Sequence, residues 1–367
     1  MANVSELETR RFPVDQLREF CTRVFVHFEV RKDDAQLAAD VLTTSDLRGI
    51  DSHGIARLPM YFEHFSVGRL NPRPRLKVLR ETPSTATIDG DNGLGLLVAP
   101  KANEIAMEKA ADVGSGWVSV CNSNHFGIAS YGPLQAIQRD MIGWAMTNAS
   151  SQVVPLWSSQ RMLGTNPLAI AFPSANEPPI VIDMATSVVA YGKIEIAQRK
   201  NQPIPDGWAL DAKGNATNDP WDATGLDYAL LPLGGDHEHG GHKGYCLGSM
   251  VDILCGVLSG AAWGPFAPNF FIPNPPVETP VGKGLGHFFG AMRVDGFMEP
   301  DDFKKRMDHW SREFRSAKAA PGTDGPLVPG LPEWEAAASR SEHGIPLDCT
   351  LVSKLREVSQ HTGVPLE

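Results

Sequence analysis

Residues 45–61, SDLRGIDSHGIARLPMY, place two arginines, two aspartates and one histidine in one short stretch. If the chain turns helical after Ser52, His53 and Arg57 lie one turn apart on one face, with Arg48 a few residues upstream. An imidazole gives or takes a proton near neutral pH, and a guanidinium grips a carboxylate with two hydrogen bonds. This combination suits reduction of a carbonyl next to a carboxylate. The alternative is a capped helix with a satisfied histidine and solvated arginines.

A second candidate site is NSNHFGIASYG, which follows the apolar run GWVSV. This order predicts that His125 sits at the carboxyl end of a strand, where polar groups commonly line the sites of α/β proteins. The alternative is a loop histidine beside Asn124, whose side chain makes turn hydrogen bonds. The residues alone favour neither interpretation.

A third candidate site combines LGTNPLAIAFP with PIVIDMATSVVAYGK. Asp183 ends an apolar run, and a buried carboxylate needs a partner. Pairing with His53 would fix the imidazole tautomer and favour its charged form. The DMATS turn is then expected to enter a helix whose first amides can bind phosphate. The alternative is that Asp183 caps this helix.

A fourth feature is the histidine- and glycine-rich segment GGDHEHGGHKGYCLGSMVDILCGVLSG. A zinc site is conceivable from His237, His239 and His242, but the segment lacks a helical HExxH frame, so we expect no metal. Small and polar residues then recur every four positions, at Gly248, Asp252, Gly256 and Gly260. They predict a helix with a close-packing face and with Lys243 at its start, suited to a phosphate or a carboxylate. The chain has no strand–GxGxxG–helix fingerprint of the Rossmann fold.

Composition limits the functional classes. The 367 residues suggest about two domains, and the formal net charge of −10 argues against nucleic acid as the main partner. The N-terminus lacks the apolar stretch of a signal peptide, and the longest apolar run, residues 245–263, reads as a buried helix and not a membrane span. Five scattered cysteines without a CxxC fit a reducing cytoplasm.

Periodicity indicates the elements that must position these residues. Helical spacing covers 14–28 and 33–48, and a third helix is expected to start after Ser52. Strands are predicted at TATI, GWVSVCNS, IGWAMTNAS, LAIAFP and PIVIDM, with helices at YGPLQAIQRD, VVAYGKIEIAQRK and EPDDFKKRMDHWSREF. Segment 207–242 reads as a long functional loop. The predicted organisation is a helical part at 1–74, a mixed α/β domain at 75–298 and a second helical part at 299–367.

Five of these motifs occur together and in order: RGIDSHGIARLPMY, NSNHFGIASYG, MLGTNPLAIAFP, VIDMATSVVAYGK and GGHKGYCLGSMVDILCGVLSG. The chain thereby resembles the type-2 malate/L-lactate dehydrogenase family, which also contains sulfolactate and ureidoglycolate dehydrogenases, diketogulonate reductase and cyclic ketimine reductases. The resemblance spans nearly the whole chain. It implies a non-Rossmann NAD(P)-binding α/β domain, a helical domain built from both chain ends, and a homodimer.

The resemblance also implies roles for individual residues. By motif, His53 matches the family's proton donor, with Asp183 as its partner. The matched substrate-binding positions are Arg48, Ser52, Arg57, His125 and Thr165. The matched cofactor-binding positions are His125, Asp183, Met184, Ala185, Thr186, Ser187, Val188, Val189, His242, Lys243, Gly244, Gly330, Leu331 and Pro332. Cys246 in place of a glycine is a small departure from the family pattern. Two further departures, the loop GGDHEHGG and the insert at 263–284, bear on the substrate more than on the reaction.

The leading hypothesis is NAD(P)-dependent interconversion of a small anionic 2-oxo acid and its 2-hydroxy acid. The alternative within the family is reduction of a C=N bond next to a carboxylate. Two further hypotheses are a histidine-metal hydrolase and a binding protein without turnover. The sequence has no recognisable contact for a 2′-phosphate, so NAD and NADP both remain open.

Overall fold

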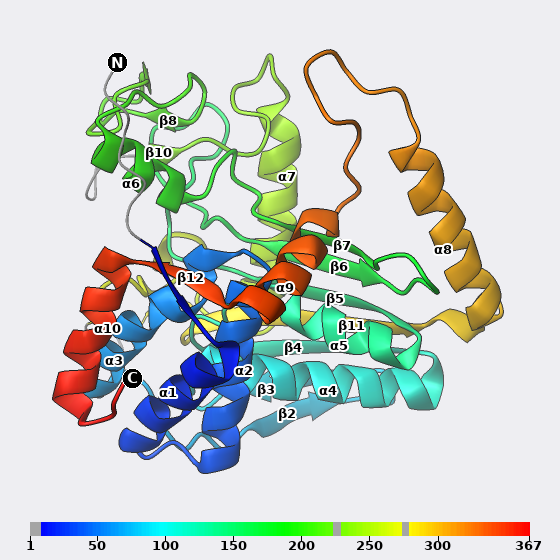
Figure 1. The fold of residues 1–367 in the computed structure, drawn as a ribbon, viewed down its shortest axis with the longest axis horizontal. Helices are drawn as coiled ribbons and strands as arrows, with labels where there is room; N and C mark the ends of the chain where they lie inside the picture. Colours follow the sequence, from blue (N-terminus) through cyan, green and yellow to red (C-terminus); the bar gives the residue numbers. More distant parts are fainter. Residues whose placement is uncertain (1–8, 223–228, 274–278) are drawn as a thin grey trace.

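A seven-stranded mixed sheet forms the centre of the computed structural model, which describes residues 9–222, 229–273 and 279–367 (Figure 1). The strand order is β2-β3-β4-β11-β5-β6-β7. The strands are β2 (Lys77–Glu81), β3 (Thr85–Asp89), β4 (Ser115–Ser123), β5 (Met141–Thr147), β6 (Leu168–Phe172), β7 (Ile180–Met184) and β11 (Leu285–Arg293). The five predicted strands are confirmed, whereas β2 and β11 were not predicted. Within this sheet only β3 and β4 pair in parallel, so it is not the doubly wound parallel sheet of a Rossmann fold.

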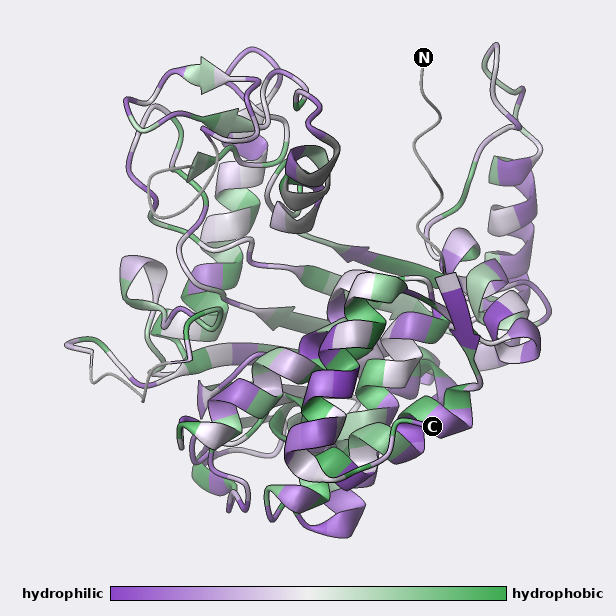
Figure 2. Cartoon of the chain, turned by 60° about the vertical axis from the view of Figure 1, so that its left-hand side comes forward, coloured by the Kyte–Doolittle hydropathy of each residue, from purple (hydrophilic) through white to green (hydrophobic). Residues whose placement is uncertain are grey.

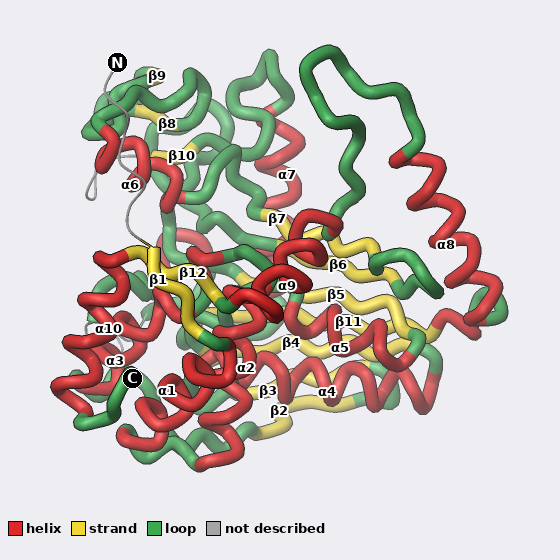
Figure 3. The backbone as a smooth tube through the Cα atoms, viewed as in Figure 1, coloured by secondary structure: helices red, strands yellow, loops and turns green. Residues whose placement is uncertain are grey.

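Helices cover both faces of the central sheet at its middle, as strand β11 illustrates. Successive side chains of a strand point to opposite faces. Phe289 belongs to the apolar cluster of α4 (Gly95–Val113), whereas Phe288 belongs to the cluster of α7 (Gly241–Asp252). Helix α5 (Tyr131–Ala136) packs on β5 beside α4. Strand β4, which leads into the site, lies inside this sheet between β3 and β11 (Figure 3).

The expectation of one buried helix over 245–263 is wrong in two respects. Helix α7 begins at Gly241 and continues into a π-helical turn over Ile253–Val257. The small-residue face of this helix packs closely against the rest of the protein, as predicted. A Cβ on Gly256 would lie 2.6 Å from the Cβ of Trp263. The backbone of the π-helical turn approaches β11 so closely that a Cβ on Gly286 would lie 1.7 Å from the Cys255 carbonyl oxygen. Because the glycine face packs inward, the large side chains at 253, 257 and 258 are more than half exposed.

Segments from the two chain ends share one hydrophobic cluster. Strand β1 (Thr9–Phe12) pairs antiparallel with β12 (Ile345–Asp348), which sets Phe12 opposite Ile345. Around this pair pack the helices α1 (Val14–His27), α2 (Lys32–Leu47), α3 (Leu58–Ser66) and α10 (Cys349–Thr362). Predicted helices 14–28 and 33–48 are confirmed as α1 and α2. The domain boundaries at 74 and 298 stay predictions.

The segment after residue 299 divides into two environments. Helix α8 (Pro300–Arg315), which was predicted, lies at the far edge of the sheet from α10 (Figure 1). There its Asp308 carboxylate accepts backbone hydrogen bonds from Ala175, Asn176 and Glu177. Helix α9 (Leu331–His343) instead returns to the terminal helices and contacts α2 and β12.

Segment 207–242 is not simply a long loop. It contains the two-residue strands β8 (Ala209–Leu210), β9 (Ala216–Thr217) and β10 (Ala229–Leu230), which form a small antiparallel sheet. Residues 223–228 of the predicted loop lie outside the described part of the chain. Helix α6 (Tyr191–Lys200) packs nearby through Ile194. Among the described residues, no helix combines the length and apolarity needed to cross a membrane.

Because helices from both chain ends share one hydrophobic cluster, we expect a core truncation in either part to lower the stability of the fold by a similar amount. Leu42 of α2 and Leu355 of α10 are fully buried in this cluster. We expect Leu42→Ala and Leu355→Ala each to lower the free energy of unfolding by about 2–5 kcal/mol, the usual cost of a large-to-small change in a core. Leu79→Ala, at a half-exposed position of β2, is the matched control and should cost far less. Urea unfolding followed by circular dichroism measures all three; a Leu355→Ala cost as small as the control's would contradict a shared core.

Candidate active site

A cavity of about 990 Å³ opens where the terminal helices meet the ends of the sheet strands. This volume is at the upper end of the range for ligand pockets and exceeds the needs of a small oxo acid alone. Five stretches of chain supply most of the lining, within residues 48–57, 125–129, 181–191, 270–271 and 327–333, and it is completed by Gln152, Thr165, Pro167, Lys193, Trp208 and Leu233. Four of the five sequence motifs therefore contribute to one site. In the hydropathy colouring, many helices of the molecule carry hydrophilic and hydrophobic residues together (Figure 2).

The turn that carries His53 is not the start of a helix, contrary to the prediction. Two 3₁₀ turns, Asp51–His53 and Ile55–Arg57, are separated by Gly54, and α3 begins only at Leu58. His53 and Arg57 nevertheless both line the cavity. The Arg57 Nε donates to the carbonyl oxygen of Ser52 at 2.6 Å, so the arginine closes the first turn.

His53 is an uncharged histidine in this cavity. Its Nδ1 lies 2.8 Å from the Ser52 hydroxyl oxygen, and its ring stacks on His125 with the ring centroids 5.5 Å apart. Burial lowers the pKa of His53 to about 4, and the positive charge of Arg57 acts in the same direction. At neutral pH the ring is therefore in its base form, ready to accept a proton.

His125 emerges directly after β4, as predicted, and its tautomer follows from its neighbours. Its Nδ1 lies 2.6 Å from the Tyr61 hydroxyl oxygen and also accepts, at 3.4 Å, from the Gly127 amide, which can only donate. Burial, followed by the charges of His53 and Arg57, holds the pKa of His125 well below its usual range. Burial also raises the pKa of Tyr61, so its hydroxyl keeps its proton and can donate. The neutral ring therefore carries its proton on Nε2 and offers an N–H donor.

Asp183 lies at the end of β7 in the same cavity, but its partner is not His53. Its carboxylate accepts a hydrogen bond from the Ser130 amide at 2.9 Å. Burial raises the pKa of Asp183, while the hydrogen bonding of Ser130 and the charge of Arg48 oppose the shift. Within the described residues no hydrogen bond or ion pair joins Asp183 to His53, and the pKa of His53 moves opposite to the direction that pairing would give.

The turn after Asp183 also differs from the prediction. Helix α6 begins at Tyr191, with Ala190 at its N-cap, so six residues separate it from β7 and Asp183 caps no helix. In this connection the Thr186 amide and hydroxyl both donate to the Thr165 carbonyl oxygen. The stretch therefore follows the wall of the cavity in an irregular conformation.

Arg48 is a buried cation with unmet hydrogen-bonding capacity. It is 7% exposed and lines the cavity, and its Nε has no hydrogen-bond partner in the described structure. Burial lowers the pKa of Arg48, whereas the charges of Glu333 and Asp183 raise it. An oxygen of a bound ligand can satisfy such a guanidinium.

The remaining predicted positions divide into two sets. Those that line the cavity are Ser52, Thr165, Met184, Ala185, Ser187, Val188, Val189, Gly330 and Pro332. Those that do not are Thr186, His242, Lys243, Gly244 and Leu331. Lys243 does lie in the first turn of α7, as predicted, with its side chain exposed. The α7 start therefore borders the site only through neighbouring residues such as Leu233.

Two of the three histidines of the α7 approach lie together. The His237 ring lies 5.7 Å from the His242 ring and 5.3 Å from the Trp157 ring, centroid to centroid, whereas the His239 Nδ1 lies 2.7 Å from an Asp236 carboxylate oxygen. In the described part of the chain no cluster of three or more histidine, cysteine, aspartate or glutamate side chains could hold a metal ion. The hydrolase hypothesis thus has no structural support there.

Several residues at the site were not predicted. Tyr61 of α3 is fully buried and does not line the cavity, but its hydroxyl lies 2.6 Å from the His125 Nδ1. Phe270 and Phe271 come from the insert, and Phe270 lies 4.8 Å from the His125 ring, centroid to centroid. The buried Gln152 presents a side-chain oxygen without a partner in the described structure. No sequence signal marks Gln152, since it lies in an irregular stretch after β5.

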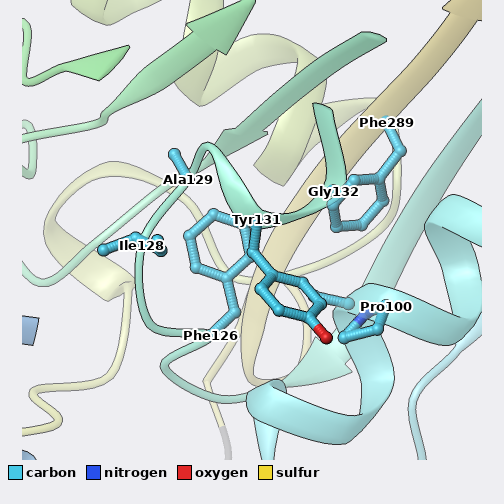
Figure 4. A pocket seen from close by; sticks show the side chains of 8 residues that line it. Pro100, Phe126, Ile128, Ala129, Tyr131, Gly132 and Phe289 are labelled. Carbon is cyan, nitrogen blue, oxygen red and sulfur yellow. The ribbon is translucent and has the colours of Figure 1, made fainter. Parts of the chain in front are cut away.

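A second, far smaller cavity of about 10 Å³ lies behind the site, against the Phe126 and Phe289 rings (Figure 4). Ile128 and Ala129 line both cavities, so this segment is the partition between them. The lining is apolar apart from Tyr131, whose hydroxyl donates to Asp40. The small cavity is therefore a packing gap and not a ligand site.

The fold and the cavity thus define a mixed α/β protein with a histidine–arginine site outside the Rossmann class. Residues 12–356 match the family described as malate/L-lactate dehydrogenase, and the chain belongs to that family. It is 41% identical to a malate dehydrogenase of Pyrococcus abyssi, over 96% of this chain and 95% of the relative. It is 38% identical to an L-sulfolactate dehydrogenase of Methanocaldococcus jannaschii, over 94% and 95%. The solved malate dehydrogenase of Pyrococcus horikoshii OT3 aligns with a TM-score of 0.88 and 37% identity, covering 100% of this chain and 99% of that one.

The lowered pKa of His53 makes a prediction about stability. The unfolded chain takes up a proton near pH 6.5, whereas the folded chain does so only near pH 4, so stability falls as the pH drops through this window. Between pH 7 and pH 5 we expect the free energy of unfolding of His53→Gln to fall by about 1–2 kcal/mol less than that of the unmodified protein. Urea unfolding at both pH values measures it, with His309→Gln on the exposed side of α8 as the control. A loss equal to that of the unmodified protein would show that His53 titrates normally.

Proposed function

We propose that this protein is an NAD(P)-dependent dehydrogenase that interconverts a small 2-oxo acid and its 2-hydroxy acid. The observation that carries the proposal is the stacked pair of neutral histidines, His53 and His125, beside Arg57 in a cavity large enough for two ligands. Malate and sulfolactate, named for the relatives, are both 2-hydroxy acids. The homodimer and the cytoplasmic location expected from the sequence stay predictions.

The two histidines support different roles. The base form of His53 can accept the hydroxyl proton of a 2-hydroxy acid and return it when the reaction runs toward reduction. Its Nδ1 is engaged by Ser52, which leaves Nε2 for the substrate oxygen. The Nε2–H of His125 can donate to the same oxygen and stabilise the negative charge that develops there.

The arginines supply the anion grip. Arg57 is the cation whose charge acts on both histidines, so a substrate carboxylate beside Arg57 brings the adjacent C2 oxygen toward the two rings. Arg48 lies between the charges of Asp183 and Glu333 and keeps an unsatisfied Nε. A ligand oxygen at Arg48 would complete its hydrogen bonding.

The residues present fit a nicotinamide cofactor, which supplies or accepts the hydride when bound. Met184, Ala185 and Ser187–Val189 would hold it on one wall, and Gly330 with Pro332 on another. Gly330 has φ +89 and a Cβ there would lie 2.9 Å from Val181, so only glycine lets the start of α9 approach β7 so closely. Asp183 can accept from an N–H group of this ligand. The choice between NAD and NADP stays open.

Removing the proton carrier tests the reaction. We expect His53→Ala to lower kcat by about 10²–10⁴-fold, the usual contribution of a general acid–base, with nicotinamide binding retained. Turnover is followed at the NAD(P)H absorbance with oxaloacetate, pyruvate, a cyclic imino acid, and pyruvate plus methylamine; cofactor binding is followed by calorimetry. Near-normal turnover of His53→Ala would move the proton transfer to another group, His125 first. Turnover of the imino acid alone would favour C=N reduction.

Lys243 tests the placement of the cofactor. The side chain lies at the start of α7, where a phosphate would meet backbone amides as well. We expect Lys243→Ala to raise the KM for NAD(P)H about tenfold, the scale of one charge-assisted hydrogen bond, and to leave the KM for the oxo acid nearly unchanged. Lys283→Ala, in the loop before β11, is the control. A rise in the oxo-acid KM alone would assign Lys243 to the substrate.

A further inference from the structure

The mechanism uses His53 and Arg57 but leaves Asp46, Asp51 and Gly54 of the same motif unexplained. We propose that Asp46 and Arg340 are positioning residues that hold the turn of His53 in place from two different helices. The proposal rests on the proposed role of His53 as the proton carrier. It concerns only how the ring is held, so it can be tested separately from the reaction.

Asp46 anchors the turn from α2. Its side chain is 1% exposed, and its carboxylate accepts the Ile55 amide at 2.7 Å across nine residues of chain. This bond lies two residues after His53, at the first residue of the second 3₁₀ turn. Burial raises the pKa of Asp46 to about 8, so the carboxyl holds its proton in much of the population at neutral pH. The acceptor oxygen, and not the negative charge, is therefore what the turn requires.

Gly54 shows how tightly the carboxyl group is seated. A Cβ on Gly54 would lie 1.9 Å from the Asp46 Oδ1 and 2.2 Å from its carboxyl carbon. The φ of −89° at Gly54 lies in the range of other residues, so a positive φ is not what requires glycine here. The glycine is needed for space, and Asp46 fills that space.

Arg340 anchors the same turn from α9. Its Nη1 donates to the Asp46 carbonyl oxygen at 2.6 Å, and its guanidinium forms an ion pair with Asp51, two residues before His53. The Arg340 side chain is mostly buried, so this pair is less screened than a surface pair. The start of α9 lines the cavity through Gly330 and Pro332, so one helix contacts both the cavity wall and the histidine turn.

The geometry explains why two anchors are needed. His53 ends a 3₁₀ turn that its own amide closes by donating to the Ile50 carbonyl oxygen at 3.0 Å, and the next turn is equally short. The His53 ring must nevertheless stay stacked on His125. A displacement of about 1 Å at a reacting group can cost about a hundredfold in rate. Asp46 fixes the turn after His53, and Arg340 fixes it before His53.

The experiment uses four variants of the full chain. Asp46→Ala removes the acceptor, Asp46→Asn keeps an acceptor oxygen, and Arg340→Met removes the second anchor. Arg139→Met removes a bidentate ion pair with Glu104 outside the cavity lining and is the matched control. Each variant is assayed for kcat, for the KM of NAD(P)H, and for the titration of the His53 Cε1–H signal by NMR, assigned by its loss in His53→Gln.

We expect Asp46→Ala and Arg340→Met to lower kcat by about 10–100-fold with the KM for NAD(P)H nearly unchanged. In both variants the pKa of His53 should rise from about 4 toward its ordinary value near 6.5, because the loosened turn admits water. Asp46→Asn and Arg139→Met should resemble the unmodified protein.

The titration separates this proposal from the proposed function. If His53→Ala keeps its turnover while Arg340→Met still shifts the His53 titration, the reaction assignment fails and the positioning stands. If His53→Ala is inactive but Arg340→Met and Asp46→Ala leave both kcat and the titration unchanged, the positioning proposal is overturned. An Asp46→Asn variant as impaired as Asp46→Ala would overturn the acceptor role.

Discussion

The partial burial of two stacked histidines beside an arginine is the constraint on which the site depends. His53 and His125 lie with their ring centroids 5.5 Å apart, and the positive charge of Arg57 acts on both. Two imidazolium ions in this arrangement would repel each other and the guanidinium, so burial and like charge together keep both rings neutral. A neutral His53 is a base, and a neutral His125 with its proton on Nε2 is a donor.

This constraint explains why the site draws on distant parts of the chain. Burying the rings requires walls on all sides, and no single motif supplies them. Tyr61 comes from the terminal helices, His125 from the end of β4, and Phe270 from the insert. The β1–β12 pair brings the last fifty residues back to the first seventy, which places α9 against α2. The terminal cluster thus serves as scaffold for the turn that carries His53.

The parts of the fold that were predictable are those governed by local periodicity. Helices α1, α2 and α8 and five sheet strands follow from apolar spacing within each segment. The predicted start of α3 was wrong because the backbone at Gly54, with ψ −143°, interrupts the helical geometry between the two 3₁₀ turns. The π-helical turn after α7 could likewise not be predicted from the sequence, since it depends on a close approach to Gly286 on β11.

The candidate site was predictable in its residues but not in their partners. His53, Arg57, His125 and Asp183 do converge on one cavity. The expected Asp183–His53 pair was wrong because the Ser130 amide, five residues after His125, donates to the Asp183 carboxylate instead. Residue type and spacing indicate which groups do chemistry. Packing at the ends of β7 and β4 decides which of two nearby groups a buried carboxylate contacts. The sequence motif alone does not indicate that choice.

Because Asp183 bonds to Ser130 and not to His53, the direction in which His53 can transfer a proton depends on the bound substrate. A fixed carboxylate beside His53 would hold the ring charged in the free protein, ready to donate. Without it, the charged form needs an anion that arrives with the substrate, because a carboxylate at Arg57 offsets the charge that lowers the pKa of His53. In the free protein His53 is then a neutral base, which suits oxidation of a hydroxy acid. In reduction, the carboxylate of the oxo acid would favour the charged form of His53, which can donate a proton. Proton supply for reduction would thereby depend on correct binding of an anionic substrate, which also discriminates against neutral carbonyl compounds.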